Sequence, residues 1–154
     1  MEHSLTRSAG ANTVLLAGRL LLSGIFLHEG ATLALNFNAT AAAFAKLGLE
    51  LPVAIGVILL QLAAGFSVAA GLATRLGAAA LGTFCLLTAL LFHTDFTSQN
   101  ELLHFEKDFA IAGGMFVLAI SGAGALSIDA VLKRNCAAPI AALLRSGSKR
   151  FTAP

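Results

Sequence analysis

The sequence predicts an all-α protein, a membrane-embedded antiparallel four-helix bundle, and three observations support this. The 154-residue chain is 57% hydrophobic and only 12% charged, whereas soluble domains contain about 25% charged residues. Its apolar segments are continuous and rich in Leu and Ala, while the strands of membrane β-barrels alternate apolar and polar residues. Four of these segments are long enough to form membrane-spanning helices of about 20 residues each.

The first predicted span, residues 13–35, follows a short polar segment, residues 1–12. It contains Arg19, His28 and Glu29, and a charged side chain near the bilayer centre carries a large free-energy cost. Partner helices must therefore shield these groups from lipid. Arg19 and Glu29 lie about 15 Å apart along the helix axis, which excludes a direct pair, and His28 lies about 180° around the helix from Arg19.

The second and third spans are predicted at residues 51–72 and 76–93, after a connection in which residues 39–47 suit a short interfacial helix. Gln61 lies near the middle of the second span, on the same helix face as Gly65. Small residues on one face allow close contact between membrane helices. The Gln61 amide is expected to form either an interhelical hydrogen bond or a contact with a ligand at mid-membrane depth.

The fourth predicted span covers residues 107–128 and completes a four-helix domain over residues 13–129. A basic tail, residues 130–154, follows it. Four spans place both termini on the same side, where most basic residues also lie: Arg7, Arg75, Lys133, Arg134, Arg145, Lys149 and Arg150. The excess of Lys and Arg on this side predicts that both termini, and the tail, are cytoplasmic.

This topology gathers polar residues of the first, third and fourth spans at the non-cytoplasmic end. They form a candidate polar outer cluster of His28, Glu29, His93, Lys107 and Asp108. One interpretation is a functional site, because imidazole and carboxylate groups bind divalent cations and His can exchange protons with a quinol near neutral pH. The alternative is a set of interfacial residues and ion pairs that stabilise the helix ends. No HExxH or other close metal-ligand spacing is present, so no metal site is assigned.

At the cytoplasmic end, Arg19, Arg75 and Asp129 are candidates for structural ion pairs, with either arginine as the partner of Asp129. The two cysteines, Cys85 and Cys136, are expected at different depths, which disfavours a disulfide. The sequence contains neither a CxxC motif nor a CxxCH haem-attachment motif. The net charge of +2 is too small to indicate binding of nucleic acid.

Several short segments between residues 16 and 129 occur in a specific order and spacing. They are RLLLSGIFLHEG at 19–30, QLAAG at 61–65, GLATR at 71–75, LFH at 91–93, KD at 107–108 and GAGALSID at 122–129. With these segments the sequence resembles the DoxX-like family of small four-helix bacterial membrane proteins. The family commonly has Glu where this chain has Gln61, and an amide cannot carry a proton as a carboxylate can.

The resemblance implies a multi-pass protein of the bacterial inner membrane with a link to redox or oxidative-stress chemistry. The leading interpretation is a membrane subunit or partner of a redox enzyme that contacts quinone. If the protein is catalytic, it is a subunit of a quinone-linked oxidoreductase. Two alternatives stay open: a non-catalytic membrane anchor or assembly factor for a redox enzyme, and a small transporter of four-helix protomers that works as a dimer.

Overall fold

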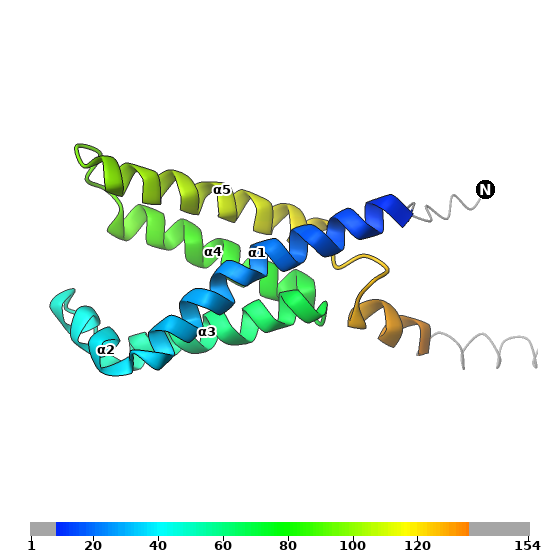
Figure 1. The fold of residues 1–154 in the computed structure, drawn as a ribbon, viewed down its shortest axis with the longest axis horizontal. Coiled ribbons are helices and arrows are strands. Elements are labelled where there is room, and N and C mark those ends of the chain that lie inside the picture. The colour runs from blue at the N-terminus through cyan, green and yellow to red at the C-terminus, as the bar shows by residue number, and fades with distance from the viewer. Residues whose placement is uncertain (1–8, 136–154) are drawn as a thin grey trace, which may run out of the picture.

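The structure, a computed structural model, describes residues 9–135, and within this range it confirms the predicted all-α class. Its helices, shown in Figure 1, are α1 (Ala9–Leu35), α2 (Phe37–Lys46), α3 (Leu51–Ala70), α4 (Thr74–Phe92) and α5 (Gln99–Ser121). A further helical segment covers residues 128–135. Most of the predicted N-terminal segment and most of the basic tail, with Cys136, lie outside the described residues.

Three helices, α1, α3 and α4, are long and apolar enough to cross a membrane, with 27, 20 and 19 residues. They match the first three predicted spans to within a few residues. The fourth long helix, α5, has 23 residues, but its first half carries charged side chains: Glu101, Glu106, Lys107 and Asp108. Among the described residues, three helices are therefore able to span a membrane. A bundle of four membrane-spanning helices stays a prediction.

Helix α5 begins and ends earlier than the predicted span over residues 107–128. The polar residues that follow Ser98 were expected in a loop, but they form the first turns of α5. The helix ends at Ser121 because Gly122 has a φ of 74°, a left-handed conformation that glycine adopts without a steric penalty. The earlier start places additional charged side chains next to the end of α4.

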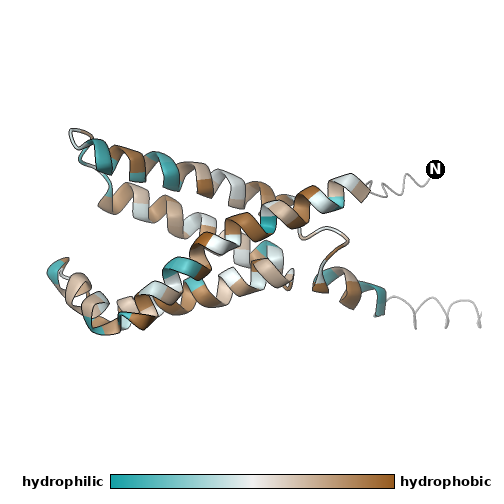
Figure 2. Ribbon diagram, in the orientation of Figure 1, coloured by the Kyte–Doolittle hydropathy of each residue, from teal (hydrophilic) through white to brown (hydrophobic). Residues whose placement is uncertain are grey.

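The long helices are arranged as two pairs (Figure 1). Helices α4 and α5 lie side by side, α1 packs along α3, and α3 contacts α4. The core between them is apolar and includes Phe26, Leu81 and Met115. Figure 2 shows mostly apolar helices, with hydrophilic residues gathered on the first turns of α5. Large side chains such as Leu21 and Ile120 are both 79% exposed, as expected for a surface that faces lipid.

Two glycines set the distance between α1 and α3. A Cβ atom at Gly30 would lie 3.0 Å from the Leu62 side chain, and one at Gly65 would lie 3.2 Å from the Leu27 side chain. Larger residues at either position would push the helices apart, because their side chains have no room. This close contact brings Gln61 of α3 next to the second half of α1.

Candidate functional site

A cavity of about 240 Å³, which we call the outer cavity, lies between the four long helices near the end predicted to be non-cytoplasmic. Its lining comes from α1 (Ile25, Phe26, Glu29), α3 (Gln61), α4 and its C-terminal cap (Phe84, Cys85, Thr88, His93) and α5 (Lys107, Asp108, Ile111). The walls thus combine apolar side chains with polar groups from every long helix. This combination is typical of sites that bind small organic molecules.

Most of the residues predicted for a site lie together in this cavity. Glu29, His93, Lys107 and Asp108 of the candidate outer cluster line it, as does Gln61. The remaining member, His28, is exposed on α1 and does not line the cavity. Neighbouring residues of a helix point about 100° apart, so a helix that turns Glu29 towards the cavity turns His28 away. The functional role of these residues stays a prediction.

Gln61 is the most deeply placed polar residue of the outer cavity. It is 6% exposed, and its Oε1 atom is buried without a hydrogen-bond partner in the described part of the chain. Most buried polar atoms in proteins have such a partner, because an unpaired one costs free energy. The Gln61 amide is therefore positioned to bind a donor from a ligand or from water.

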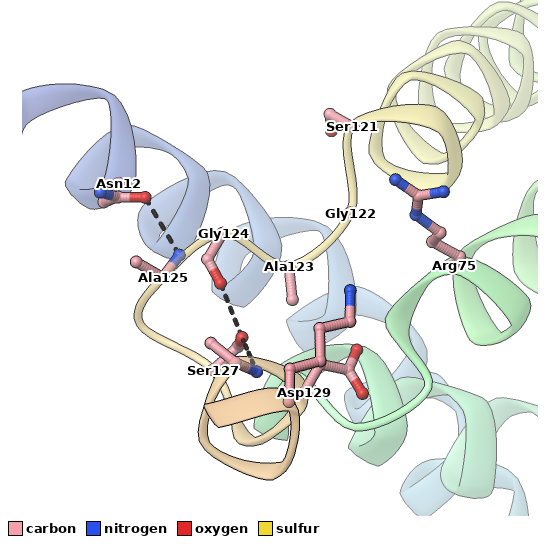
Figure 3. A pocket seen from close by; sticks show the side chains of 11 residues that line it. Asn12, Arg75, Ser121, Gly122, Ala123, Gly124, Ala125, Ser127 and Asp129 are labelled. Atoms are coloured by element: carbon pink, nitrogen blue, oxygen red, sulfur yellow. Dashed lines mark hydrogen bonds between the residues drawn. The ribbon is translucent and has the colours of Figure 1, made fainter. Parts of the chain in front are cut away.

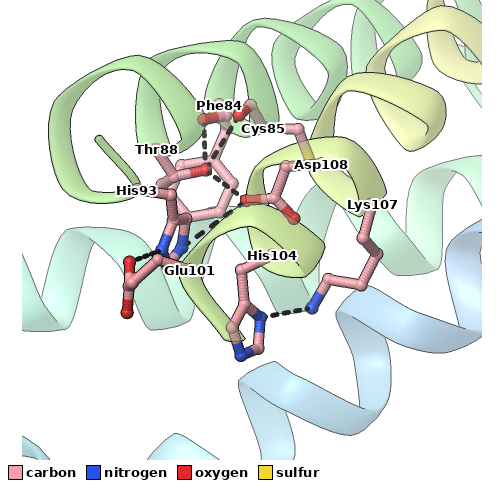
Figure 4. A network of polar contacts seen from close by, with 8 residues as sticks. All are labelled: Phe84, Cys85, Thr88, His93, Glu101, His104, Lys107 and Asp108. Carbon is pink, nitrogen blue, oxygen red and sulfur yellow. Dashed lines mark hydrogen bonds and ion pairs between the residues drawn. The ribbon is translucent and has the colours of Figure 1, made fainter. Parts of the chain in front are cut away.

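A network of polar side chains joins the cavity to the loop between α4 and α5 (Figure 4). His93 Nδ1 lies 2.8 Å from Glu101 Oε2, and His93 Nε2 lies 3.9 Å from Asp108 Oδ2. The Thr88 hydroxyl donates to the same Asp108 oxygen at 3.2 Å. The rings of His93 and His104 are stacked, with centroids 5.2 Å apart. His93 thus connects the carboxylate in the cavity wall with a second carboxylate, Glu101, that is more exposed to solvent.

His93 lies between two carboxylates, Glu101 and Asp108. A protonated imidazole donates through both ring nitrogens, whereas a neutral one donates through one nitrogen and accepts through the other. In the neutral form only one of the two carboxylates, Glu101 or Asp108, faces an N–H group. His93 forms a hydrogen bond with Glu101 at 2.8 Å, whereas its 3.9 Å contact with Asp108 would have to shorten before a proton could pass between them.

The candidate outer cluster left out two members of this network, Glu101 and His104, which were expected in the loop before the fourth span. In the structure both belong to α5, together with Asp108. The spacing of 101, 104 and 108 places all three on one face of a helix. That spacing is visible in the sequence and could have identified the network. Among the described residues, no group of three or more His, Cys, Asp or Glu side chains is arranged to hold a metal ion.

The residues predicted to form ion pairs at the cytoplasmic end have main-chain partners instead. Arg19 is 3% exposed and donates from Nη1 to the Ala123 carbonyl at 2.9 Å and from Nη2 to the Leu126 carbonyl at 3.0 Å. All ion pairs found between described residues involve His93. The expected pair between Arg19 and Asp129 is not formed, because the chain after α5 presents its carbonyl groups to the guanidinium.

Asp129 binds the start of α4. Its carboxylate accepts hydrogen bonds from the main-chain N–H groups of Ala73, at 2.8 Å, and Thr74, at 3.2 Å. Burial raises the pKa of the Asp129 carboxyl, but these hydrogen bonds favour the charged form and the net effect is a lowered pKa. The second predicted partner, Arg75, is exposed and lies beside Gly122.

Comparison with known proteins identifies the family to which this chain belongs. The DoxX family model matches residues 14–94, a range that includes Arg19, Glu29, Gln61 and His93 and ends before α5. Two relatives come from Escherichia coli K12. Inner membrane protein YqjF is 35% identical over 123 residues, which cover 78% of this chain and 92% of the relative. Inner membrane protein YphA is 30% identical over 128 residues, which cover 79% and 91%. No solved structure matches significantly.

Proposed function

Because this chain belongs to the DoxX family of membrane proteins, we propose that it lies in a bacterial inner membrane and binds the ring of a quinone in its outer cavity for a partner redox enzyme. Both similar E. coli proteins are inner membrane proteins. The basic residues near the ends of the chain support an orientation with both termini in the cytoplasm.

The observation that carries the proposal is the unpaired amide oxygen of Gln61 in a cavity with mixed walls. A quinol hydroxyl would donate to the buried Oε1 atom. Phe26, Phe84 and Ile111 would contact the faces of the ring. The volume of about 240 Å³ is below the roughly 300–1,000 Å³ of sites for drug-sized ligands. The cavity therefore suits a single ring, and an isoprenoid tail would extend out between the helices into lipid.

Asp108 and His93 would exchange protons with the bound ring. A quinone takes up equal numbers of electrons and protons when it becomes a quinol, and the partner enzyme would supply the electrons. Asp108 lines the cavity and contacts Thr88, and His93 links it to Glu101. Gln61 has no proton to give, so its role would be to hold the ring.

The test is a titration of the detergent-solubilised protein with a short-tailed benzoquinol, and isothermal titration calorimetry measures the affinity. Gln61→Leu removes the unpaired oxygen at similar volume and should weaken binding at least tenfold, which corresponds to about 1.4 kcal/mol. Asp108→Asn should also weaken binding, because it removes the carboxylate from the cavity wall. Gln61→Glu, which restores the residue common in the family, should retain binding.

Two variants serve as matched controls. His28→Ala alters an exposed histidine beside Glu29, and Glu106→Gln alters an exposed carboxylate on α5; both should bind quinol as the unmodified protein does. Equal affinity of Gln61→Leu and the unmodified protein would refute the proposal. A protein that binds no quinol but copurifies with a redox enzyme would support the anchor alternative instead.

A further inference from the structure

A second and larger pocket, the inner pocket, lies at the opposite end of the molecule (Figure 3). Its volume is about 440 Å³, and it lies where α1 and α4 begin and where α3 and α5 end. The lining residues are Asn12, Arg75, Ser121, Gly122, Ala123, Gly124, Ala125, Ser127, Asp129, Ala130 and Lys133. Because it lies at the ends of helices that can span a membrane, it is at the depth of the lipid head groups.

Two of the lining residues, Arg75 and Lys133, are exposed cations. Figure 3 shows the Arg75 side chain next to Gly122 at the end of α5, and a Cβ atom at Gly122 would lie 3.2 Å from Arg75 Nε. Neither cation forms an ion pair within 4.0 Å in the part of the chain that the structure describes. Lys133 attracts Asp129 at longer range, but neither cation is held in a direct pair, so both side chains can bind a negatively charged group in the pocket.

A third cation, Arg19, lies behind the pocket wall. Its guanidinium holds the carbonyl groups of Ala123 and Leu126, and its buried Nε atom has no hydrogen-bond partner among the described residues. Arg19, Arg75 and Lys133 contribute three positive charges and Asp129 one negative charge, so the net charge here is 3 − 1 = +2.

Asp129 attracts Arg19 and Lys133 electrostatically, but it forms no ion pair with either within 4.0 Å among the described residues. Its carboxylate oxygens are bound by the main-chain N–H groups of Ala73 and Thr74, so they are directed to the start of α4. The pocket therefore combines a net positive charge with open volume at the depth of the head groups.

We infer that the inner pocket binds the phosphate group of an anionic phospholipid through Arg75 and Lys133. Basic pockets between membrane helices on the cytoplasmic side are typical sites for such head groups, and positive-inside reasoning predicts this end to be cytoplasmic. Apolar side chains adjacent in sequence to the lining residues are available for the acyl chains, since Leu76 is 74% and Ile120 79% exposed. The site does not depend on the outer cavity or on quinone.

The experiment measures thermal unfolding of the full-length protein, delipidated in a neutral detergent, with added lipid. Phosphatidylglycerol should raise Tm by about 3–5 °C over phosphatidylcholine. The double variant Arg75→Gln/Lys133→Gln should lose this difference. Lys46→Gln, which changes an exposed lysine at the end of α2, should keep it. Native mass spectrometry of the same samples counts bound lipid, so that a change in the basal stability of a variant does not obscure the result.

Equal Tm values in the two lipids, or an undiminished phosphatidylglycerol effect in the double variant, would overturn the inference. Inorganic phosphate is the third arm of the experiment. If phosphate alone reproduced the effect of phosphatidylglycerol, the ligand would be a free anion and the lipid assignment would be wrong. Because quinol is absent from all samples, these outcomes are independent of the proposed function.

Discussion

The two ends of the molecule hold their charged residues in different ways. At the inner end, Arg19 binds main-chain carbonyl groups and Asp129 binds main-chain N–H groups. At the outer end, His93 and Asp108 contact other side chains, and Gln61 retains an unpaired oxygen. Bonds to the main chain fix the path of the backbone, whereas bonds among side chains can rearrange with a ligand or a proton. Substitutions at the inner end should therefore reduce stability, and those at the outer end should alter binding.

The largest effect is expected for Arg19→Met. The substitution removes two charge-assisted hydrogen bonds and leaves the carbonyl groups of Ala123 and Leu126 without their donor. Each buried unpaired carbonyl costs about 1–3 kcal/mol, so we expect a loss of about 3–5 kcal/mol in the free energy of unfolding. Titration with a denaturing detergent, followed by circular dichroism, measures it. Arg134→Met, at an exposed arginine, is the control and should have little effect. If both variants had similarly small effects, the main-chain bonds of Arg19 would not stabilise the inner end.

The next effect concerns Gly71, where α3 ends. Its φ is 74°, and a Cβ atom there would lie 2.6 Å from both Arg19 Nη1 and Ser127 Cβ. Gly71→Ala should therefore cost about 2–4 kcal/mol, from the left-handed backbone and from displacement of Arg19. Gly48 is a matched control, because its φ is 73° but no atom lies within 4 Å of its Cβ position. Gly48→Ala should cost only about 1 kcal/mol, and equal costs would show that Arg19 is not held tightly.

The sequence predicted α1, α3 and α4, because each is a long, mostly apolar segment. Residues 51–70 contain no charge, and a long uncharged segment has few alternatives in a membrane protein. The start of α5 was missed because the charged residues 101–108 are typical of a loop when they are considered without the partner helix. In the structure they are supported by contacts with Thr88 and His93.

The sequence predicted that Glu29, His93, Lys107 and Asp108 lie near one another, and they line one cavity. It did not predict which side chains they contact. Helical geometry predicts that Arg19 and His28 face different surroundings, and they do, since one is buried and the other exposed. The partners of Arg19 could not be predicted, because every residue has a carbonyl group and the sequence does not show which one a guanidinium will reach. For the same reason the sequence offered Arg19 and Arg75 as partners of Asp129, whereas the structure places neither in an ion pair with it within 4.0 Å among the described residues.

A smaller effect is expected for Asp129→Asn, which keeps one acceptor oxygen but replaces the other with an NH₂ group. One of the two hydrogen bonds to the start of α4 would be lost, at a cost of about 1 kcal/mol. The pKa of Asp129 is lowered in the folded protein. Its stabilising contribution is therefore complete above the unfolded pKa of about 3.9 and is lost as the pH falls through the lowered folded value.

Unfolding experiments at pH 7 and in acid test this sign. The unmodified protein should be more stable than Asp129→Asn at pH 7, and the difference should shrink as the pH falls below about 4. A difference that stayed constant into strong acid would show that the charge of Asp129 contributes nothing to holding α4. The inner end would then resemble the outer end more closely than the hydrogen bonds indicate.

The smallest effect on stability is expected for Thr88→Val at the outer end. The Thr88 hydroxyl has one proton but lies within hydrogen-bond distance of Asp108 and of the carbonyl groups of Phe84 and Cys85. Its loss should change the free energy of unfolding by no more than about 0.5 kcal/mol, because the helix keeps its main-chain bonds. Asp108 would lose one of its two contacts, however, and quinol affinity should fall about threefold. If Thr88→Val lost stability but kept its quinol affinity, the proposed difference between the two ends would be contradicted. The hydrogen bond between Thr88 and Asp108 would then stabilise the fold and not the bound quinol.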